Sequence, residues 1–155
     1  MKKSKSGRHP FVRFLFLVYA AALLWLLFGR TSAWTEGLSY KETLRQNTNL
    51  SPLLTIQNYW YVIRHSSVAS LVRHCSINLV GNILLFIPPG YWLVRIWPRF
   101  RNLFLFLISC AGLILLIETL QLFTLLGRFD VDDIILNLAG MLIGYLFCLL
   151  RHRKK

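Results

Sequence analysis

Polar side chains interrupt the apolar stretches of this sequence at positions where burial makes them costly and therefore informative. Asn78 and Asn82 are four residues apart, and Glu118 and Gln121 are three apart, so each pair shares one helix face. Asn137 lies near the start of the last apolar stretch. A carboxylate among apolar residues must be protonated, hydrogen-bonded or paired with a cation. These residue types predict either a ligand site or hydrogen bonds that hold helices together.

The short link before the last apolar stretch is rich in charge, with Arg128, Asp130, Asp132 and Asp133. Carboxylate oxygens are the ligands of hard cations, but the link lacks the length and the later Glu of an EF-hand. Asp132 or Asp133 is instead expected to cap the following helix, because a helix N-terminus favours negative charge. No Cys/His metal spacing occurs, so neither a metal nor a cofactor is predicted.

The elements that carry these groups are predicted to be membrane-spanning helices. Hydrophobic residues make up 55% of the 155 and charged residues 15%, where soluble proteins have about 25% charged residues. Apolar runs cover residues 11–28, 77–94, 103–126 and 134–150, each close to the ~20 residues that a spanning helix needs. The fold class is therefore all-α, an integral membrane bundle of about four transmembrane helices. Pro88-Pro89-Gly90 is expected to kink or end the second helix.

Basic residues set the expected orientation. They form three clusters, and the four spans place all three on one side, which the positive-inside rule assigns to the cytoplasm. The clusters are Lys2, Lys3, Lys5, Arg8 and Arg13; Arg95, Arg99 and Arg101; and Arg151, Arg153, Lys154 and Lys155. The sequence predicts a multi-pass protein of the cytoplasmic membrane, with basic cytoplasmic tails at residues 1–9 and 151–155. A net charge of +12 arranged in this way does not indicate nucleic-acid binding.

Residues 29–75 are expected to be external and too short to fold as an independent domain. Ile56, Tyr59, Trp60 and Ile63 follow helical spacing, which predicts an amphipathic interfacial helix or a re-entrant segment on the outer leaflet. The first apolar run also resembles a signal peptide, with a cleavage-like site at residues 31–33. Its length exceeds a usual signal core of about 7–15 residues, which favours a retained span.

Depth along the helices brings the polar groups together. At 1.5 Å per residue, Glu118 lies roughly 9–14 Å from the outer end of its span. Asn82 and Asn137 lie in the same outer half, which predicts a polar cavity that opens outward. Gly140 and Gly144 are expected to serve helix packing, with Gly81 in a similar role. The candidate ligand-binding residues are Asn78, Asn82, Glu118, Gln121, Arg128, Asp130, Asp132, Asp133 and Asn137.

Four blocks of this sequence resemble the VanZ-like family, named for a teicoplanin-resistance accessory protein. The blocks are Asn49-Leu50-Ser51-Pro52-Leu53-Leu54-Thr55-Ile56, then residues 82–90 with Asn82 and Pro88-Pro89-Gly90, then Glu118-Thr119-Leu120-Gln121, and lastly residues 127–133 followed by Asn137 and Gly140. The resemblance covers residues 10–150. It implies a bacterial cytoplasmic membrane protein and a role in lowering sensitivity to lipoglycopeptide antibiotics.

Three functions remain open on these residues. The first is non-enzymatic binding of an amphiphile at the outer leaflet, with a lipoglycopeptide or a lipid-linked cell-wall precursor as ligand. The second is a membrane-embedded enzyme acting on a lipid head group, with Glu118 as general base, Asp130 or Asp132 as its partner and Arg128 on phosphate. The third is a transporter or channel, which four spans would form only as an oligomer. Membrane lipids are expected partners in each case, and a homo-oligomer is compatible with all three.

Overall fold

The computed structural model describes residues 10–29 and 33–153, and it confirms the all-α class. The basic tails at 1–9 and 154–155, and residues 31 and 32 of the cleavage-like site, lie outside the described residues. In chain order the elements are α1 (Pro10–Phe28), α2 (Tyr40–Gln46), β1 (Thr48–Asn49), α3 (Leu54–His65), α4 (Ala69–Ile96), the 3-10 helix η1 (Pro98–Arg101), α5 (Leu103–Phe123), β2 (Phe129–Asp130) and α6 (Val131–Arg153).

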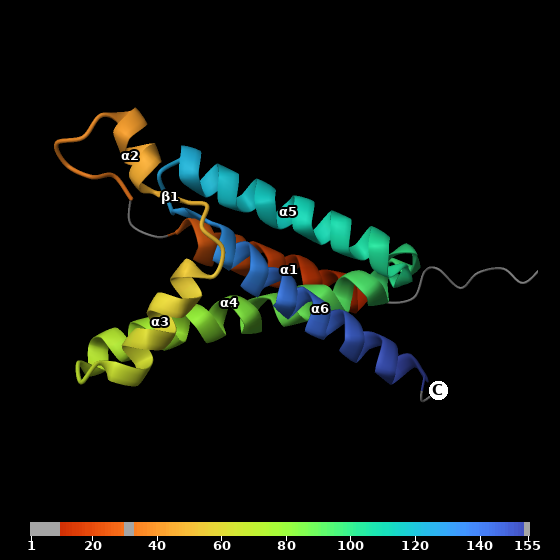
Figure 1. Ribbon diagram of the computed structural model, residues 1–155. Coiled ribbons are helices and arrows are strands. Elements are labelled where there is room, and N and C mark those ends of the chain that lie inside the picture. Colours follow the sequence, from red (N-terminus) through yellow and green to blue (C-terminus); the bar gives the residue numbers. More distant parts are fainter. Residues whose placement is uncertain (1–9, 30–32, 154–155) are drawn as a thin grey trace, which may run out of the picture.

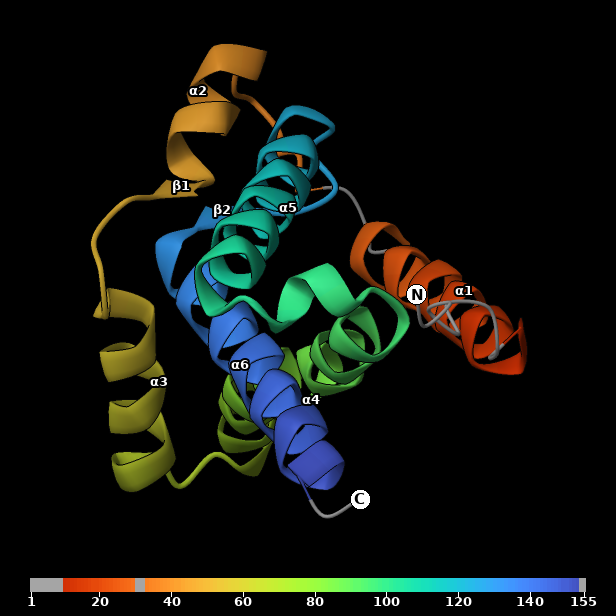
Figure 2. The same ribbon diagram turned by 90° about the vertical axis from the view of Figure 1, so that its right-hand side faces the viewer.

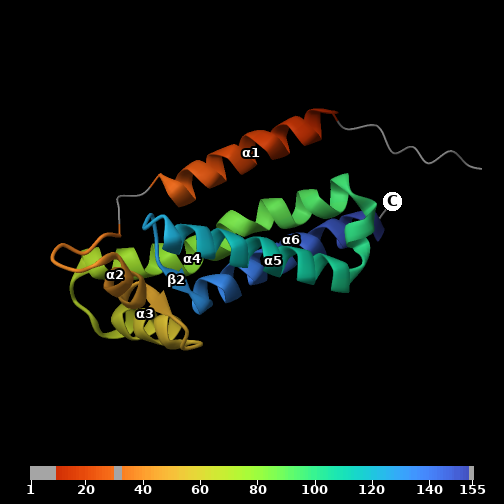
Figure 3. The same cartoon turned by 90° about the horizontal axis from the view of Figure 1, so that it is seen from above.

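Four helices, α1, α4, α5 and α6, are long and apolar enough to cross a membrane. They lie side by side, with the short elements α2, β1, α3 and β2 gathered at one end of the bundle (Figures 1 and 3). We call this the α3 end. The described chain begins and ends at the other end, as the expected even number of crossings requires. Arg95, Arg99, Arg101 and Arg151 also lie there, and we call it the basic end.

Close packing of α4 on α6 forms the centre of the bundle. A Cβ added at Gly140 would strike the backbone oxygen of Ile83, and one at Gly144 would strike that of Ile87. Both glycines therefore let the two backbones approach directly, and the predicted packing role is confirmed. Gly90 makes the reciprocal contact from α4, against the backbone of Met141. A Cβ added at Gly81 would have no neighbour within 4 Å, so Gly81 does not provide the close backbone contact predicted for it.

The prolines do not end the second span. Helix α4, 28 residues long, continues through Pro88 and Pro89, so of the predicted kink or end the end does not occur. Proline at 89 supplies no N–H for the carbonyl of Leu85, one turn earlier. The hydroxyl of Tyr19 on α1 donates a hydrogen bond to that carbonyl at 2.9 Å. A neighbouring helix thus satisfies the freed backbone group, as spanning helices require in a medium without water.

Helix α1 is the least embedded of the four and lies to one side of the others when the bundle is viewed from its basic end (Figure 2). Its contacts with α4 are largely aromatic. Phe16 lies edge-on to Trp92 and Trp97, and Tyr19 lies edge-on to Trp92. Most of its other large apolar side chains are exposed, as expected for a helix that faces lipid.

The segment before α4 is ordered against the bundle. The Nδ2 of Asn47 donates to the carbonyl of Ala33, and the N–H of Ala33 donates to the carbonyl of Leu125. Strands β1 and β2 pair in parallel, with Thr48 opposite Phe129. The amphipathic helix was predicted and is present as α3. The strands were not predicted, and α4 begins at Ala69 rather than at Ile77, because its first two turns pack on α3.

Candidate functional site

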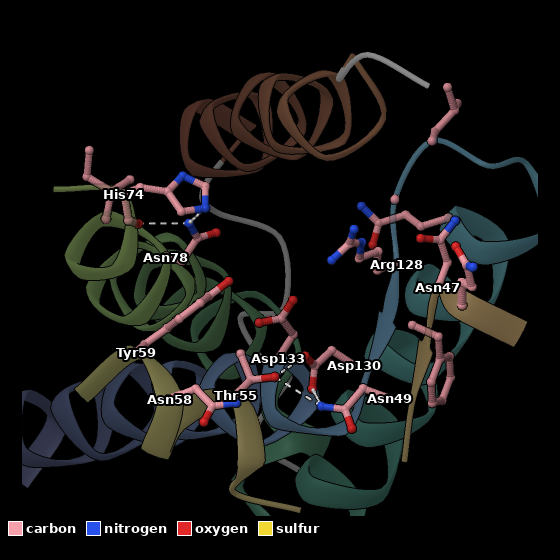
Figure 4. Close-up of a pocket in the computed structure, with 16 residues that line it drawn as sticks. Asn47, Asn49, Thr55, Asn58, Tyr59, His74, Asn78, Arg128, Asp130 and Asp133 are labelled. Carbon is pink, nitrogen blue, oxygen red and sulfur yellow. Dashed lines mark hydrogen bonds between the residues drawn. The ribbon is translucent and has the colours of Figure 1, made fainter. Parts of the chain in front are cut away.

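A pocket of about 960 Å³ opens at the α3 end, between α3, α4 and the two strands (Figure 4). Its wall is a mixture of amides, acids, aromatic rings and one arginine. The lining residues are Gln46, Asn47, Asn49, Thr55, Asn58, Tyr59, His74, Ile77, Asn78, Gln121, Leu126, Gly127, Arg128, Phe129, Asp130 and Asp133. A polar cavity was predicted from the depth of Asn82, Glu118 and Asn137; the pocket at the α3 end is partly polar, but none of these three residues belongs to its lining.

The carboxylate of Asp130 connects three elements around the pocket, namely β1, α3 and the first turn of α6. Its carboxylate accepts a hydrogen bond from the hydroxyl of Thr55 at 2.6 Å and another from the amide of Asn49 at 3.2 Å. Its Oδ1 also accepts from the backbone N–H of Asp132 at 2.9 Å, the geometry of an N-cap on α6. The cap of α6 is therefore Asp130, whereas Asp132 or Asp133 was predicted.

Asp132 contacts a different helix, α3, although it follows Asp130 by only two residues. It is fully buried, and its carboxylate accepts from the backbone N–H groups of Leu53 at 2.5 Å and Ile56 at 3.0 Å. These are orphan donors at the start of α3, where Leu53 has a φ of 66° and no side-chain cap of its own. An acid of α6 therefore caps α3 from outside that helix.

Asp133 lies in the lining and connects it to α4. The amide of Asn82 donates to Asp133 Oδ1 at 2.5 Å. In Figure 4 the Asp133 carboxylate points into the space between Tyr59 and Arg128. Asn78 is one turn before Asn82 and also lines the pocket. Its amide donates to the carbonyl of His74 at 2.8 Å, so its nitrogen is partly engaged by its own helix.

Two predicted residues of α5 differ in position. Glu118 is buried behind the lining, and one oxygen accepts from the backbone N–H of Asp130 at 3.5 Å. Gln121 is also buried but borders the pocket. Its amide nitrogen donates to the carbonyl of Leu27 at 2.8 Å, near the end of α1. Gln121 therefore fastens α1 to α5 while presenting part of its side chain to the pocket.

Asn137, one turn after Asp133 on α6, is buried to 3% exposure. Its Oδ1 is a buried oxygen with no hydrogen-bond partner among the described residues. It does not line the pocket.

The structure thus divides the nine predicted residues into two groups. Asn78, Gln121, Arg128, Asp130 and Asp133 form part of the lining. Asn82, Glu118 and Asp132 lie outside the lining and each contacts a lining acid or its backbone, while Asn137 is buried further along α6.

Sequence reasoning missed much of the opposite wall. Asn49, Thr55, Asn58, Tyr59 and His74 all border the pocket. Asn49 and Thr55 belong to the family-like block at residues 49–56, so that resemblance pointed to two lining residues that were not included among the candidates. His74 and Tyr59 meet edge to face at 6.3 Å between ring centroids.

The pKa of Tyr59 depends on burial and on the charges that line the pocket. Burial raises the pKa of its phenol above the ordinary value of 10.0, and the charge of Asp133 raises that pKa further. The charge of Arg128 acts in the opposite direction. Because Tyr59 belongs to α3 and these charges belong to the β2–α6 region, the three residues share one electrostatic environment.

Comparison with known proteins gives one result. A family model described as VanZ/LLP1 matches residues 16–152, nearly the whole chain. No curated protein and no solved structure matches the chain.

Proposed function

Because this chain belongs to the VanZ/LLP1 family, we propose that its pocket binds the polar head of an amphiphile at the outer leaflet. The two ligand classes are a lipoglycopeptide antibiotic and a lipid-linked cell-wall precursor. Sequestration of either would lower the sensitivity of the cell to lipoglycopeptides. The observation that carries the proposal is a pocket of about 960 Å³ whose wall combines Arg128, several amides and an apolar edge.

The polar part of the pocket suits a sugar- or phosphate-bearing head group. Asn47, Asn49, Asn58 and Asn78 provide amide groups, and Arg128 provides a guanidinium. Figure 4 shows the Arg128 side chain extending into the open space of the pocket. An arginine fork recognises planar or tetrahedral anions through paired hydrogen bonds. Amides donate and accept, which matches the hydroxyl and amide groups of a sugar.

The apolar edge suits an acyl or prenyl chain. Ile77 borders the pocket and is 62% exposed. Val80 and Leu84 follow it at helical spacing on α4 and are also exposed. These side chains form a strip that leads from the pocket along the outside of α4. In a membrane that strip contacts lipid, so a chain attached to a bound head group could leave the pocket directly into the bilayer.

We also infer that the α3 end faces outward and the basic end faces the cytoplasm, which makes the pocket accessible to external ligands. The support is the placement of Arg95, Arg99, Arg101 and Arg151 at the basic end. The test is membrane-impermeant thiol labelling of intact cells on a cysteine-free background. We expect labelling of Asn58→Cys from outside and none of Arg99→Cys, and labelling of Arg99→Cys would overturn the orientation.

Direct binding to the purified protein in nanodiscs tests the function. The probes are a fluorescent lipoglycopeptide, a glycopeptide without an acyl chain, and a lipid-linked cell-wall precursor. We expect binding of at least one of the two amphiphiles and none of the unacylated glycopeptide. Arg128→Gln should weaken that binding about tenfold, the size of one charged hydrogen bond.

Arg64→Gln is the matched control, because Arg64 belongs to α3 but lies over the Trp60 ring outside the lining. Its affinity should equal that of the unmodified protein. Equal affinity of the Arg128 variant and the control would refute the pocket as the binding site. Turnover of the labelled precursor would instead assign an enzyme.

A further inference from the structure

The basic end of the bundle brings three arginines together from three elements. Arg95 lies in the last turn of α4, Arg101 ends η1, and Arg151 lies near the end of α6. The hydroxyl of Tyr145 on α6 donates to the carbonyl of Arg101 at 2.8 Å, which ties η1 to α6. The three positions are therefore set by packed elements rather than by a loose tail.

The register of α4 against α6 brings Arg95 and Arg151 to the same level. Gly144 contacts the backbone of Ile87 and Tyr91, and the two helices run in the same direction. Arg95 follows Tyr91 by about one turn on α4, and on α6 Cys148 and Arg151 follow Gly144 by about one and two turns. The charges of Arg95, Arg101 and Arg151 all act on the buried thiol of Cys148, which agrees with the placement of the three residues by η1, α4 and α6 at this end of the bundle.

These charges have no acidic side chain nearby. The chain has six acidic side chains, and all six are among the described residues. None belongs to η1 or to the last two turns of α4 and α6. They are Glu36, Glu42, Glu118, Asp130, Asp132 and Asp133, which lie in the segments of the α3 end or in the adjoining half of α5. Neighbouring like charges repel one another, so an anion supplied from outside the chain stabilises this arrangement.

Exposed apolar side chains lie beside the arginines. Phe147 and Leu150 on α6 are 61% and 59% exposed, and Phe104 at the start of α5 is 76% exposed. A partner at this place must therefore offer an anionic group and a long apolar part. Phospholipids have both, and they surround any chain that spans a membrane.

We propose that Arg95, Arg101 and Arg151 form a binding site for the phosphate of an anionic phospholipid, with its acyl chains against Phe147, Leu150 and Phe104. This site lies at the opposite end from the pocket and does not depend on the function proposed above. Guanidinium groups form paired hydrogen bonds to phosphate oxygens, which distinguishes the site from a diffuse attraction between a basic tail and the membrane surface.

Native mass spectrometry of the delipidated full-length protein tests the site. The probes are phosphatidylglycerol and phosphatidylcholine, added in equal amounts, and the readout is the ratio in which they bind. The unmodified protein should prefer phosphatidylglycerol. The combined variant Arg95→Gln, Arg101→Gln and Arg151→Gln should reduce that preference about tenfold, the sum of three modest ion pairs.

The control variant removes the same charge from the tail, through Lys2→Gln, Lys3→Gln and Lys5→Gln, and should keep the preference. An equal loss in both variants would show a diffuse charge effect and overturn the proposal, as would an unmodified protein without preference. If the triple arginine variant does not fold, Arg151→Gln replaces it, because that side chain is exposed. Its preference should fall about twofold, as for one of three similar ion pairs, and an unchanged preference would overturn the site.

Discussion

The glycine seam between α4 and α6 and the α3 end of the bundle are held together in different ways. In the seam, Gly90, Gly140 and Gly144 bring backbone against backbone, beside the buried side chains of Phe86 and Met141. At the α3 end, carboxylates accept hydrogen bonds from segments far away in the sequence, as when Asp132 binds the N–H groups that begin α3. Shape determines the first region, and polar pairing determines the second.

This difference separates a rigid part of the molecule from a part that can open. The seam leaves no space for an added methyl group, so α4 and α6 pack against each other in a single arrangement. Helix α3 has no buried residue and depends on its contacts with α4 and on the hydrogen bonds that it donates to Asp130 and Asp132. Regions with few buried apolar contacts open at low free energy, which suits the wall of a ligand pocket.

The largest effect is expected in the seam. Gly144→Leu forces a side chain into the backbone of Ile87 and Tyr91, which should cost about 3 kcal/mol or more of folding free energy. The yield of monodisperse protein in detergent measures this loss. Gly112→Leu is the control, because Gly112 has no neighbour within 4 Å and is exposed on α5. Normal yield of the Gly144 variant would contradict backbone contact in the seam.

A smaller and local effect is expected at the α3 end. Asp132→Asn replaces a double acceptor with an amide that turns one N–H donor toward another, at a cost of about 2 kcal/mol. Hydrogen exchange should accelerate in residues 53–65, while α5 and α6 keep their protection. Glu36→Gln removes the same charge from an exposed position and should change neither. Loss of protection throughout the bundle would show that the two regions unfold as one unit.

The sequence predicted the seam better than it predicted the α3 end. Long apolar runs and the spacing of Gly140 and Gly144 are local patterns, and a small-residue face has few functions other than close packing. The helix does not end at Pro88-Pro89, because the hydrogen bond that replaces the missing N–H donor comes from outside α4. The hydroxyl that satisfies Leu85 comes from Tyr19, on another helix.

At the α3 end the sequence identified the acids but not their partners. Asp130 and Asp132 are two residues apart, and one caps α6 while the other caps α3. Nothing in their spacing indicates which helix each serves, because the answer depends on the pairing of β1 with β2. Two-residue strands are too short to leave a periodic pattern. Asn49 and Thr55 were therefore missed as lining residues, although both belong to a family-like block that continues into the first turn of α3.

The smallest expected effect is a titration that reports whether α3 covers the pocket. Burial, and next the charge of Asp133, raise the pKa of Tyr59 above 10.0. A pKa raised in the folded state means that the neutral phenol stabilises the fold. That contribution is complete below pH 10 and is lost as the pH rises through the folded-state pKa. Ultraviolet absorbance of phenolate, compared between the unmodified protein and Tyr59→Phe, should therefore assign to Tyr59 a component that titrates above pH 10. In the Asp132→Asn background α3 is released, and the same component should move back toward 10.0. A Tyr59 component at or below pH 10 in the unmodified protein would place its phenol in water and contradict the closed arrangement of α3 over the acids.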